Sequence, residues 1–217
     1  MDFELARRNM VENQVRTWDV LDARTLDVLT DVPREDFVAP AYRKLAFADT
    51  ELPIGHGESM MKPVVEGRLL QALALKATDR VLEIGTGSGF VTACMAQLAD
   101  AVLSVEQHAD LAEMARSRLV KAAISNAHVE VATVLENFAT SETFDVVVLT
   151  GAVYALPDAF REWVRPGGRL FAVIGASPAM QAMLATRGDG DHWHEEILFE
   201  TDLPYLNHAA PPQRFVL

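Results

Sequence analysis

Three glycines between an apolar run and a helical segment are the residues that most clearly point to chemistry. Residues 81–89 read VLEIGTGSG, a pattern that predicts a strand followed by a tight turn and the start of a helix. Glycine at 85, 87 and 89 lets the backbone turn sharply and approach a ligand without a Cβ in the way. Because such a turn also occurs without a ligand, the functional interpretation needs a second residue.

Glu106 is that second residue. It ends the next expected strand, 101–106, and follows Gly89 by 17 residues, close to the ~20 typical of an acidic residue that binds ribose hydroxyls. A carboxylate can accept two hydrogen bonds from a cis-diol at once. A solvated charge at a strand end is the alternative. Nicotinamide cofactors are bound by the same logic, but their fingerprint is G-x-G-x-x-G, whereas this loop reads G-x-G-x-G.

The elements that must position these groups follow from short apolar runs that alternate with helical ones. Runs apolar on both faces and separated by helices predict an α/β fold, with a parallel sheet covered by helices on both sides. A pair of strands near the end departs from this rhythm and predicts an antiparallel hairpin. The expected strands are 80–84, 101–106, 129–131, 144–149, 168–174, 180–187 and 195–203, and helices are expected at 88–98, around 111–122 and at 155–164.

Upstream of this core the first 35 residues predict two helices, with a break at Val32-Pro33. Residues 39–63 show little periodicity and are expected to form a long structured loop, a kind of segment that is usually functional. We therefore expect one domain over 1–217, with N-terminal helices and a substrate loop in 1–62 and a cofactor-binding α/β core in 63–217.

Composition narrows the function classes. The 217 residues include 31 acidic and 19 basic side chains, a net charge of −12, which disfavours non-specific binding to nucleic acid or anionic membranes. One cysteine and six scattered histidines predict no disulfide within the chain and no zinc site. The opening MDFELARR does not resemble a secretion signal, and apolar runs break well before the ~20 residues of a membrane span. We expect a cytoplasmic protein; its oligomeric state stays open.

The string EIGTGSG at 83–89 resembles motif I of the S-adenosylmethionine-dependent methyltransferases. This resemblance implies a Rossmann-like methyltransferase sheet with helices on both faces, closed by the antiparallel C-terminal hairpin. It implies S-adenosyl-L-methionine as the cofactor. The residues expected to bind it are Glu83, Gly85, Thr86, Gly87, Ser88, Gly89, Glu106, Gln107 and Glu136.

Other segments are similar to the protein-L-isoaspartate (D-aspartate) O-methyltransferase family. They are VPREDFV at 32–38, LPIGHG at 52–57, LEIGTGSG at 82–89, FDVVVLTGA at 144–152 and PGGRL at 166–170, within a resemblance that covers roughly residues 5–206. It implies carboxyl O-methylation of L-isoaspartyl residues in damaged proteins, so the partner would be a protein or peptide. The residues expected to contact substrate are Ile54, Gly55, Met60, Met61, Thr150 and Gly151, with Ser59 as the catalytic candidate.

The sequence departs from the family in the loop that follows Gly57. The family continues G-Q-T-I-S-x-P, so Ser59 falls on the threonine and Met61 falls on the serine that helps to position the substrate carboxylate. A thioether cannot donate a hydrogen bond to a carboxylate, and Glu58 in place of glutamine adds a negative charge. Further on, the family's Gly-Asp-Gly is absent, and Glu136 stands nearest to its aspartate.

Methyl transfer to an ionised carboxylate needs positioning rather than a base, and positioning can supply ~7–11 kcal/mol. A hydroxyl or amine acceptor would need a base, for which the loop offers His56 or Glu58. Three functions therefore stay open. They are isoaspartyl carboxyl methylation, methylation of another acceptor such as a small molecule or a modified peptide, and cofactor binding without catalysis.

Overall fold

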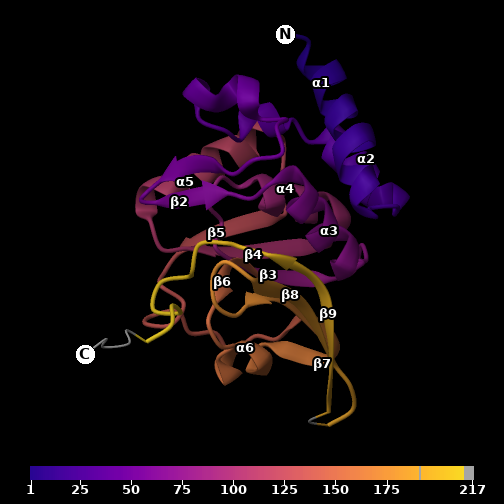
Figure 1. The fold of residues 1–217 in the computed structure, drawn as a ribbon. Coiled ribbons are helices and arrows are strands. Elements are labelled where there is room, and N and C mark those ends of the chain that lie inside the picture. The colour runs from indigo at the N-terminus through magenta and orange to yellow at the C-terminus, as the bar shows by residue number, and fades with distance from the viewer. Residues whose placement is uncertain (191, 213–217) are drawn as a thin grey trace, which may run out of the picture.

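The computed structural model describes residues 1–190 and 192–212, and its centre is a seven-stranded sheet in the order β5-β4-β3-β6-β7-β8-β9 (Figure 1). Strands β5 to β7 in this order are parallel, whereas β8 pairs antiparallel with both β7 and β9. The strands are β3 Arg80–Ile84, β4 Ala101–Glu106, β5 Ala127–Val131, β6 Phe144–Val153, β7 Val164–Ile174, β8 Met180–Arg187 and β9 Trp193–Thr201. The expected α/β sheet and its C-terminal antiparallel hairpin are confirmed.

Helices cover both faces of the sheet, as the two-sided apolar strands predict. In Figure 1, α3, α4 and α5 lie on one side of the sheet and α6 on the other. Within β3, Leu82 and Ile84 pack in the cluster on the α6 side, with Phe160, while Val81 packs in the other cluster. The helices are α3 Pro63–Leu73, α4 Phe90–Leu98, α5 Ala109–Lys121 and α6 Asp158–Glu162. In the described part of the chain, no helix could span a membrane.

The N-terminal segment forms the two expected helices, α1 Phe3–Met10 and α2 Ala23–Asp31. The first continues through a π turn and a 3₁₀ turn to Trp18, and the second begins where the Asp22 carboxylate accepts a hydrogen bond from the backbone N–H of Thr25. It ends before Pro33, as expected. Their buried side chains join those of α3 in one apolar cluster, so these helices rest on the core.

Residues 39–63 are more regular than expected. A 3₁₀ helix spans Pro40–Leu45, and the strands β1 Leu52–Gly55 and β2 Glu58–Met60 form an antiparallel hairpin. Its turn needs positive φ at Gly55, His56 and Gly57, which explains the two glycines. Strands of four and three residues are too short for the sequence pattern to reveal.

Several expected boundaries are wrong. Strand β5 begins at residue 127 rather than 129, β7 begins at 164 rather than 168, β9 spans 193–201 rather than 195–203, and α4 begins at 90 rather than 88. Two further differences concern β6 and the helix that follows it. Strand β6 runs to Val153 rather than ending at residue 149, because Ala152 pairs with β7 and bonds to the backbone at Pro204 and Leu206. The helix expected at 155–164 is only Asp158–Glu162, because Pro157 precedes it and Val164 already pairs with β6. The register between β6 and β7 slips between Val148 and Ala152, which is where residues 150 and 151 lie.

Candidate active site

A cleft of about 690 Å³ lies at the carboxyl ends of the parallel strands. The chain runs from β3 outward through β4 to β5 and then returns to β6 on the other side of β3, so this edge of the sheet is a topological switch point. The cleft is lined by Ile54, Glu58, Ser59, Ile84, Gly85, Gly87, Val105, Glu106, Gln107, Leu111, Ala132, Thr133, Val134, Leu135, Thr150, Gly151, Phe160, Pro204, Tyr205, Leu206 and Asn207.

The glycine loop forms the floor between β3 and α4. Gly85 and Gly87 have φ of 99° and 51°. A Cβ at Gly85 would lie 2.5 Å from Oγ1 of Thr150, a distance that no side chain tolerates. The Thr150 hydroxyl itself donates to the carbonyl of Ile84 at 2.8 Å. The backbone of the glycine loop thus lines the cleft and rests on Thr150 of β6. A residue larger than glycine at position 85 would fill the space between the loop and Thr150.

Glu106 stands at the end of β4 and is almost fully buried. One carboxylate oxygen accepts a hydrogen bond from the backbone N–H of Gly87 at 2.8 Å, and the other accepts from the N–H of His108 at 3.0 Å. These bonds fix the carboxylate in the cleft wall beside the glycine loop. The sequence expectation that Glu106 and this loop act together is consistent with this contact.

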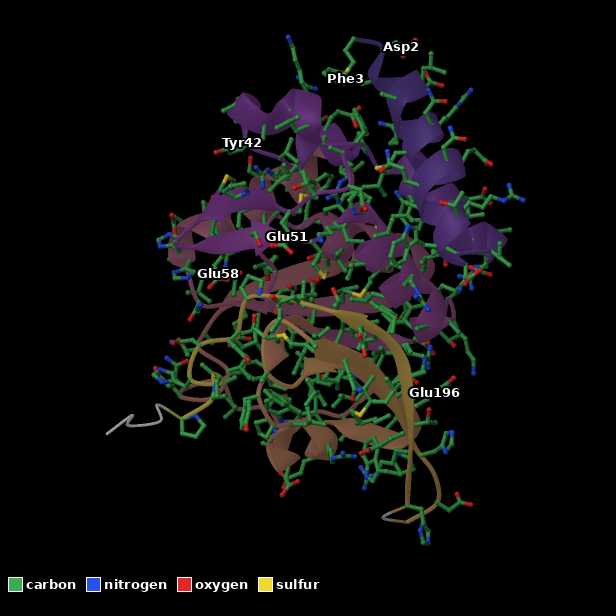
Figure 2. The ribbon with its side chains drawn as sticks, viewed as in Figure 1. Asp2, Phe3, Tyr42, Glu51, Glu58 and Glu196 are labelled. Atoms are coloured by element: carbon green, nitrogen blue, oxygen red, sulfur yellow. The ribbon has the colours of Figure 1, made fainter. Side chains whose placement is uncertain are left out.

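The β1–β2 hairpin forms the outer wall, and Figure 2 shows Glu58 on it and Glu51 just before it, above the sheet in that view. At its turn the ring of His56 stacks on that of His108, with 3.9 Å between centroids, and His56 Nε2 lies 2.9 Å from Asp110. These contacts attach the hairpin to the start of α5. The Ser59 hydroxyl donates to Glu51 at 3.2 Å, so its hydrogen points along the hairpin.

Glu58 faces the same histidines. Burial raises the pKa of its carboxyl group, and the positive potential of His108 opposes that change. Gln107 also reaches it, with Nε2 3.5 Å from the carboxylate. The negative charge that this sequence adds to the loop thus lines the cleft near one donor, Gln107, two histidines and the like charge of Glu106.

A smaller cavity of about 320 Å³ continues from the cleft beneath the hairpin. It shares Ile54, Ser59, Gly85, Gly87 and Thr150 with the cleft and extends to Met60, Met61, Glu66, Glu83, Thr86, Ser88 and Val91. Both methionines are buried. Met61, which stands where the family resemblance expects a serine, therefore forms part of an apolar wall of this cavity.

A sequence model of the protein-L-isoaspartate(D-aspartate) O-methyltransferase family matches residues 6–200. The chain belongs to this family. Relatives named protein-L-isoaspartate O-methyltransferase include one from Koribacter versatilis, 36% identical over 85% of this chain and 83% of its own length. Another, from Opitutus terrae, is 34% identical over 97% of this chain and 85% of its own length.

Solved structures of the family share the fold. A structure from Plasmodium falciparum, described as a putative protein-L-isoaspartate O-methyltransferase in complex with S-adenosyl-L-homocysteine, superposes with a TM-score of 0.81 at 18% identity. The alignment covers 93% of this chain and 98% of that one. A second structure, titled protein-L-isoaspartate O-methyltransferase, has a TM-score of 0.78 at 21% identity, covering 91% of this chain and 65% of its own.

The structure brings most of the expected site residues of this O-methyltransferase chain together. Ile54, Ser59, Gly85, Gly87, Glu106, Gln107, Thr150 and Gly151 line the cleft, and Met60, Met61, Glu83, Thr86 and Ser88 line the smaller cavity. Three residues line neither. Gly55 belongs to the hairpin turn, Gly89 caps α4 against Ala115, and Glu136 pairs with His208.

The sequence analysis did not predict two of the segments that line the cleft, nor one buried charged residue. The walls are residues 132–135, which follow β5, and 204–207, which follow β9. Neither carries a motif. The charge is Glu66, fully buried in α3; a lone acidic residue inside the apolar run PVVEG could have signalled it, because unpaired charges are seldom buried. Across residues 1–190 and 192–212, no group of three or more His, Cys, Asp or Glu side chains could hold a metal ion.

Glu83 should make stability depend on pH. It is fully buried; one oxygen accepts hydrogen bonds from Thr92 and Ser104, yet burial raises its pKa to about 7. Because this pKa exceeds the unfolded value, the folded protein binds more protons, and stability falls as pH rises from about 5 through 7. We expect Glu83→Gln to remove part of this decline in melting temperature. Glu4→Gln, at an exposed carboxylate, is the control; an unchanged slope in Glu83→Gln would contradict the prediction.

Proposed function

We propose that this protein transfers a methyl group from S-adenosyl-L-methionine to the carboxylate of L-isoaspartyl residues in damaged proteins. The family match over residues 6–200 carries this proposal. The cleft supports it, because its exposed glycine backbone, its fixed carboxylate and its apolar walls suit the charged and apolar parts of such a cofactor.

Each part of the cleft has a role in this proposal. Glu106 binds the ribose hydroxyls, with Gln107 beside it. The backbone at Gly85 and Gly87 contacts the amino-acid end of the cofactor, and residues 132–135 pack on the adenine. When bound, the cofactor supplies a methyl group on a sulfonium, which is a good leaving group.

For methyl transfer, the protein must align the acceptor carboxylate with the methyl group and exclude water from the reacting atoms. An ionised carboxylate is already a nucleophile, so no base has to remove a proton. Thr150 and Gly151 line the cleft beside the glycine loop, while Met60 and Met61 exclude water from the cavity beneath the hairpin. In this proposal Ser59, which lines both the cleft and the smaller cavity, contacts the acceptor through its hydroxyl group, which donates to Glu51 in the structure.

A second candidate is methylation of a different acceptor, and the observation that favours it is the buried Met61. This side chain offers no hydrogen bond to a carboxylate where the family has a serine hydroxyl. The acceptor could then be a small molecule or a modified peptide, while cofactor binding would be unchanged.

The test incubates the protein with methyl-labelled S-adenosyl-L-methionine and an isoaspartyl peptide, beside the same peptide with a normal aspartyl residue. We expect a base-labile methyl ester on the isoaspartyl peptide alone. The matched variant is Met61→Ser. If only this variant labels the peptide, the native protein has another acceptor. If neither does so, although calorimetry shows that both bind the cofactor, the proposed reaction is wrong.

A further inference from the structure

The β1–β2 hairpin carries part of the site although it is too short to hold itself in place. Its strands have four and three residues, and their pairing slips between Pro53 and Gly55. A two-stranded hairpin on its own is marginally stable at best. Because Ile54 and Ser59 line both the cleft and the smaller cavity, the shape of the site depends on what fixes the hairpin to the rest of the protein.

One end of the hairpin is anchored in the protein interior. Met60 and Met61 are buried, and Nη2 of Arg34 donates to the carbonyl of Met61 at 2.8 Å. Nearer the turn, Ile54 extends over the glycine loop, where a Cβ at Gly87 would lie 3.1 Å from Cδ1 of Ile54. The part of the hairpin that covers the glycine loop therefore lies beyond the anchored end.

At the other end, the hairpin turn meets α5 through two histidines. The rings of His56 and His108 are nearly parallel, with 9° between their planes and 3.9 Å between their centroids. Two polar contacts lie beside this stack: His56 bonds to the exposed Asp110, and Gln107 reaches Glu58 at 3.5 Å. Because an exposed pair and a long hydrogen bond contribute little, the stacked rings are the stronger attachment at this end.

His108 also connects the stack to the cofactor side of the cleft. Its backbone N–H donates at 3.0 Å to Glu106, the carboxylate that binds the ribose under the proposed function. One residue thus contacts the outer wall of the cleft through its ring and the cofactor-binding carboxylate through its backbone. Since the backbone bond does not involve the ring, a substitution at position 108 can remove the stack and leave this bond to Glu106 in place.

We propose that His56 and His108 are positioning residues for methyl transfer, because their stacked rings hold the hairpin over the glycine loop at a fixed distance from Glu106. The inference rests on the proposed function. Neither ring lines the cleft or the smaller cavity, so both act through Ile54 and Ser59 rather than on the acceptor itself. A displacement of about 1 Å in an active site can cost about 100-fold in rate, so a hairpin that is free to move would slow the reaction.

Substitutions on both sides of the stack test the proposal by methylation of the isoaspartyl peptide. His56→Gly removes one ring and suits the backbone there, where φ is 55°. His108→Ala removes the other ring, whereas His108→Phe keeps an aromatic ring at the same place. We expect kcat to fall at least about 10-fold in His56→Gly and in His108→Ala, with little change in the KM for S-adenosyl-L-methionine. His108→Phe should stay within about threefold of the native kcat, because it can still stack.

A double variant shows whether the two rings act as one unit. His56→Gly/His108→Ala should be no slower than the slower of the two single variants, because either substitution alone already removes the stack. His194→Ala changes an exposed histidine of β9 that lines neither cavity, and as the control it should keep the native rate. The proposal would be overturned by additive losses in the double variant, or by equal losses in His108→Phe and His108→Ala.

Amide hydrogen exchange tests the stack without turnover. Residues 52–60 should exchange at least about threefold faster in His56→Gly and in His108→Ala than in the native protein, while the central strands of the sheet keep their protection. Unchanged exchange in the hairpin would overturn the proposal even if kcat fell. Faster exchange with a native kcat would also overturn it, because the hairpin would then not position the acceptor. If the native protein does not methylate the peptide, the proposed function fails, and exchange in the hairpin alone decides whether the stack holds it.

Discussion

Glu106→Ala should weaken the binding of S-adenosyl-L-homocysteine by at least about 100-fold, since two hydrogen bonds to a charged group contribute about 1.5–3 kcal/mol each. In the structure the same carboxylate accepts from the backbone N–H groups of Gly87 and His108. Its removal would thus deprive the ribose hydroxyls of their acceptor and release the glycine loop at the same time. Calorimetric titration of the folded variant gives the dissociation constant directly.

The matched control is Glu136→Ala. The sequence places this carboxylate among the cofactor-binding candidates, whereas the structure pairs it with His208, and it does not line the cleft. We expect its affinity for S-adenosyl-L-homocysteine to stay within about twofold of the native value, because exposed ion pairs contribute little. If both variants lost affinity equally, the assignment of the ribose to Glu106 would be wrong.

Arg34→Met should lower the free energy of unfolding by about 3–5 kcal/mol, the usual effect of removing one partner of a buried ion pair. Glu66 would lose its counter-ion, and the carbonyls of Ala46 and Met61 would lose their donor. The guanidinium also lies over the ring of Phe90, 4.9 Å from its centroid, so packing on α4 would weaken too. Urea unfolding at pH 8 measures the change.

The double variant Arg34→Met/Glu66→Met should recover most of this loss, since an apolar pair of similar volume often replaces a buried ion pair without penalty. Arg8→Met, which breaks an exposed pair with Glu4, should change stability by less than about 1 kcal/mol. If Arg34→Met were as stable as Arg8→Met, the buried pair of Arg34 and Glu66 would not contribute to the free energy of unfolding as predicted.

Much of the fold could be predicted because the parallel strands are apolar on both faces. The bounds expected for β3, β4 and β8 are those observed. The β1–β2 hairpin could not be predicted, because its strands are short and its turn depends on positive φ rather than on a hydrophobic period. The division at residue 62 stays a prediction, although one apolar cluster includes side chains from both sides of it.

The cleft could be located from the sequence where a residue type has few other uses. Glycines before a helix and an acidic residue at the next strand end point to Gly85, Gly87 and Glu106, which line the cleft, while their roles stay predictions. Residues 132–135 and 204–207 enter the cleft only because the chain folds back over it, and their types carry no chemical signature. The pairing of Arg34 with Glu66 is likewise invisible in sequence, because 32 residues separate the two.

The last wall of the cleft has a consequence for biosynthesis. Residues 204–207 lie against β6 through backbone hydrogen bonds at Ala152, and the tight approach of Leu206 to Gly151 leaves no room for a Cβ there. A chain growing from the ribosome can pair β3 with β4 and β6 long before this segment is translated. It cannot complete the cleft until Asn207 has emerged. We therefore expect shorter nascent chains to stay unliganded, so that stabilisation by the cofactor begins only after residues 204–207 have been added and have folded against β6.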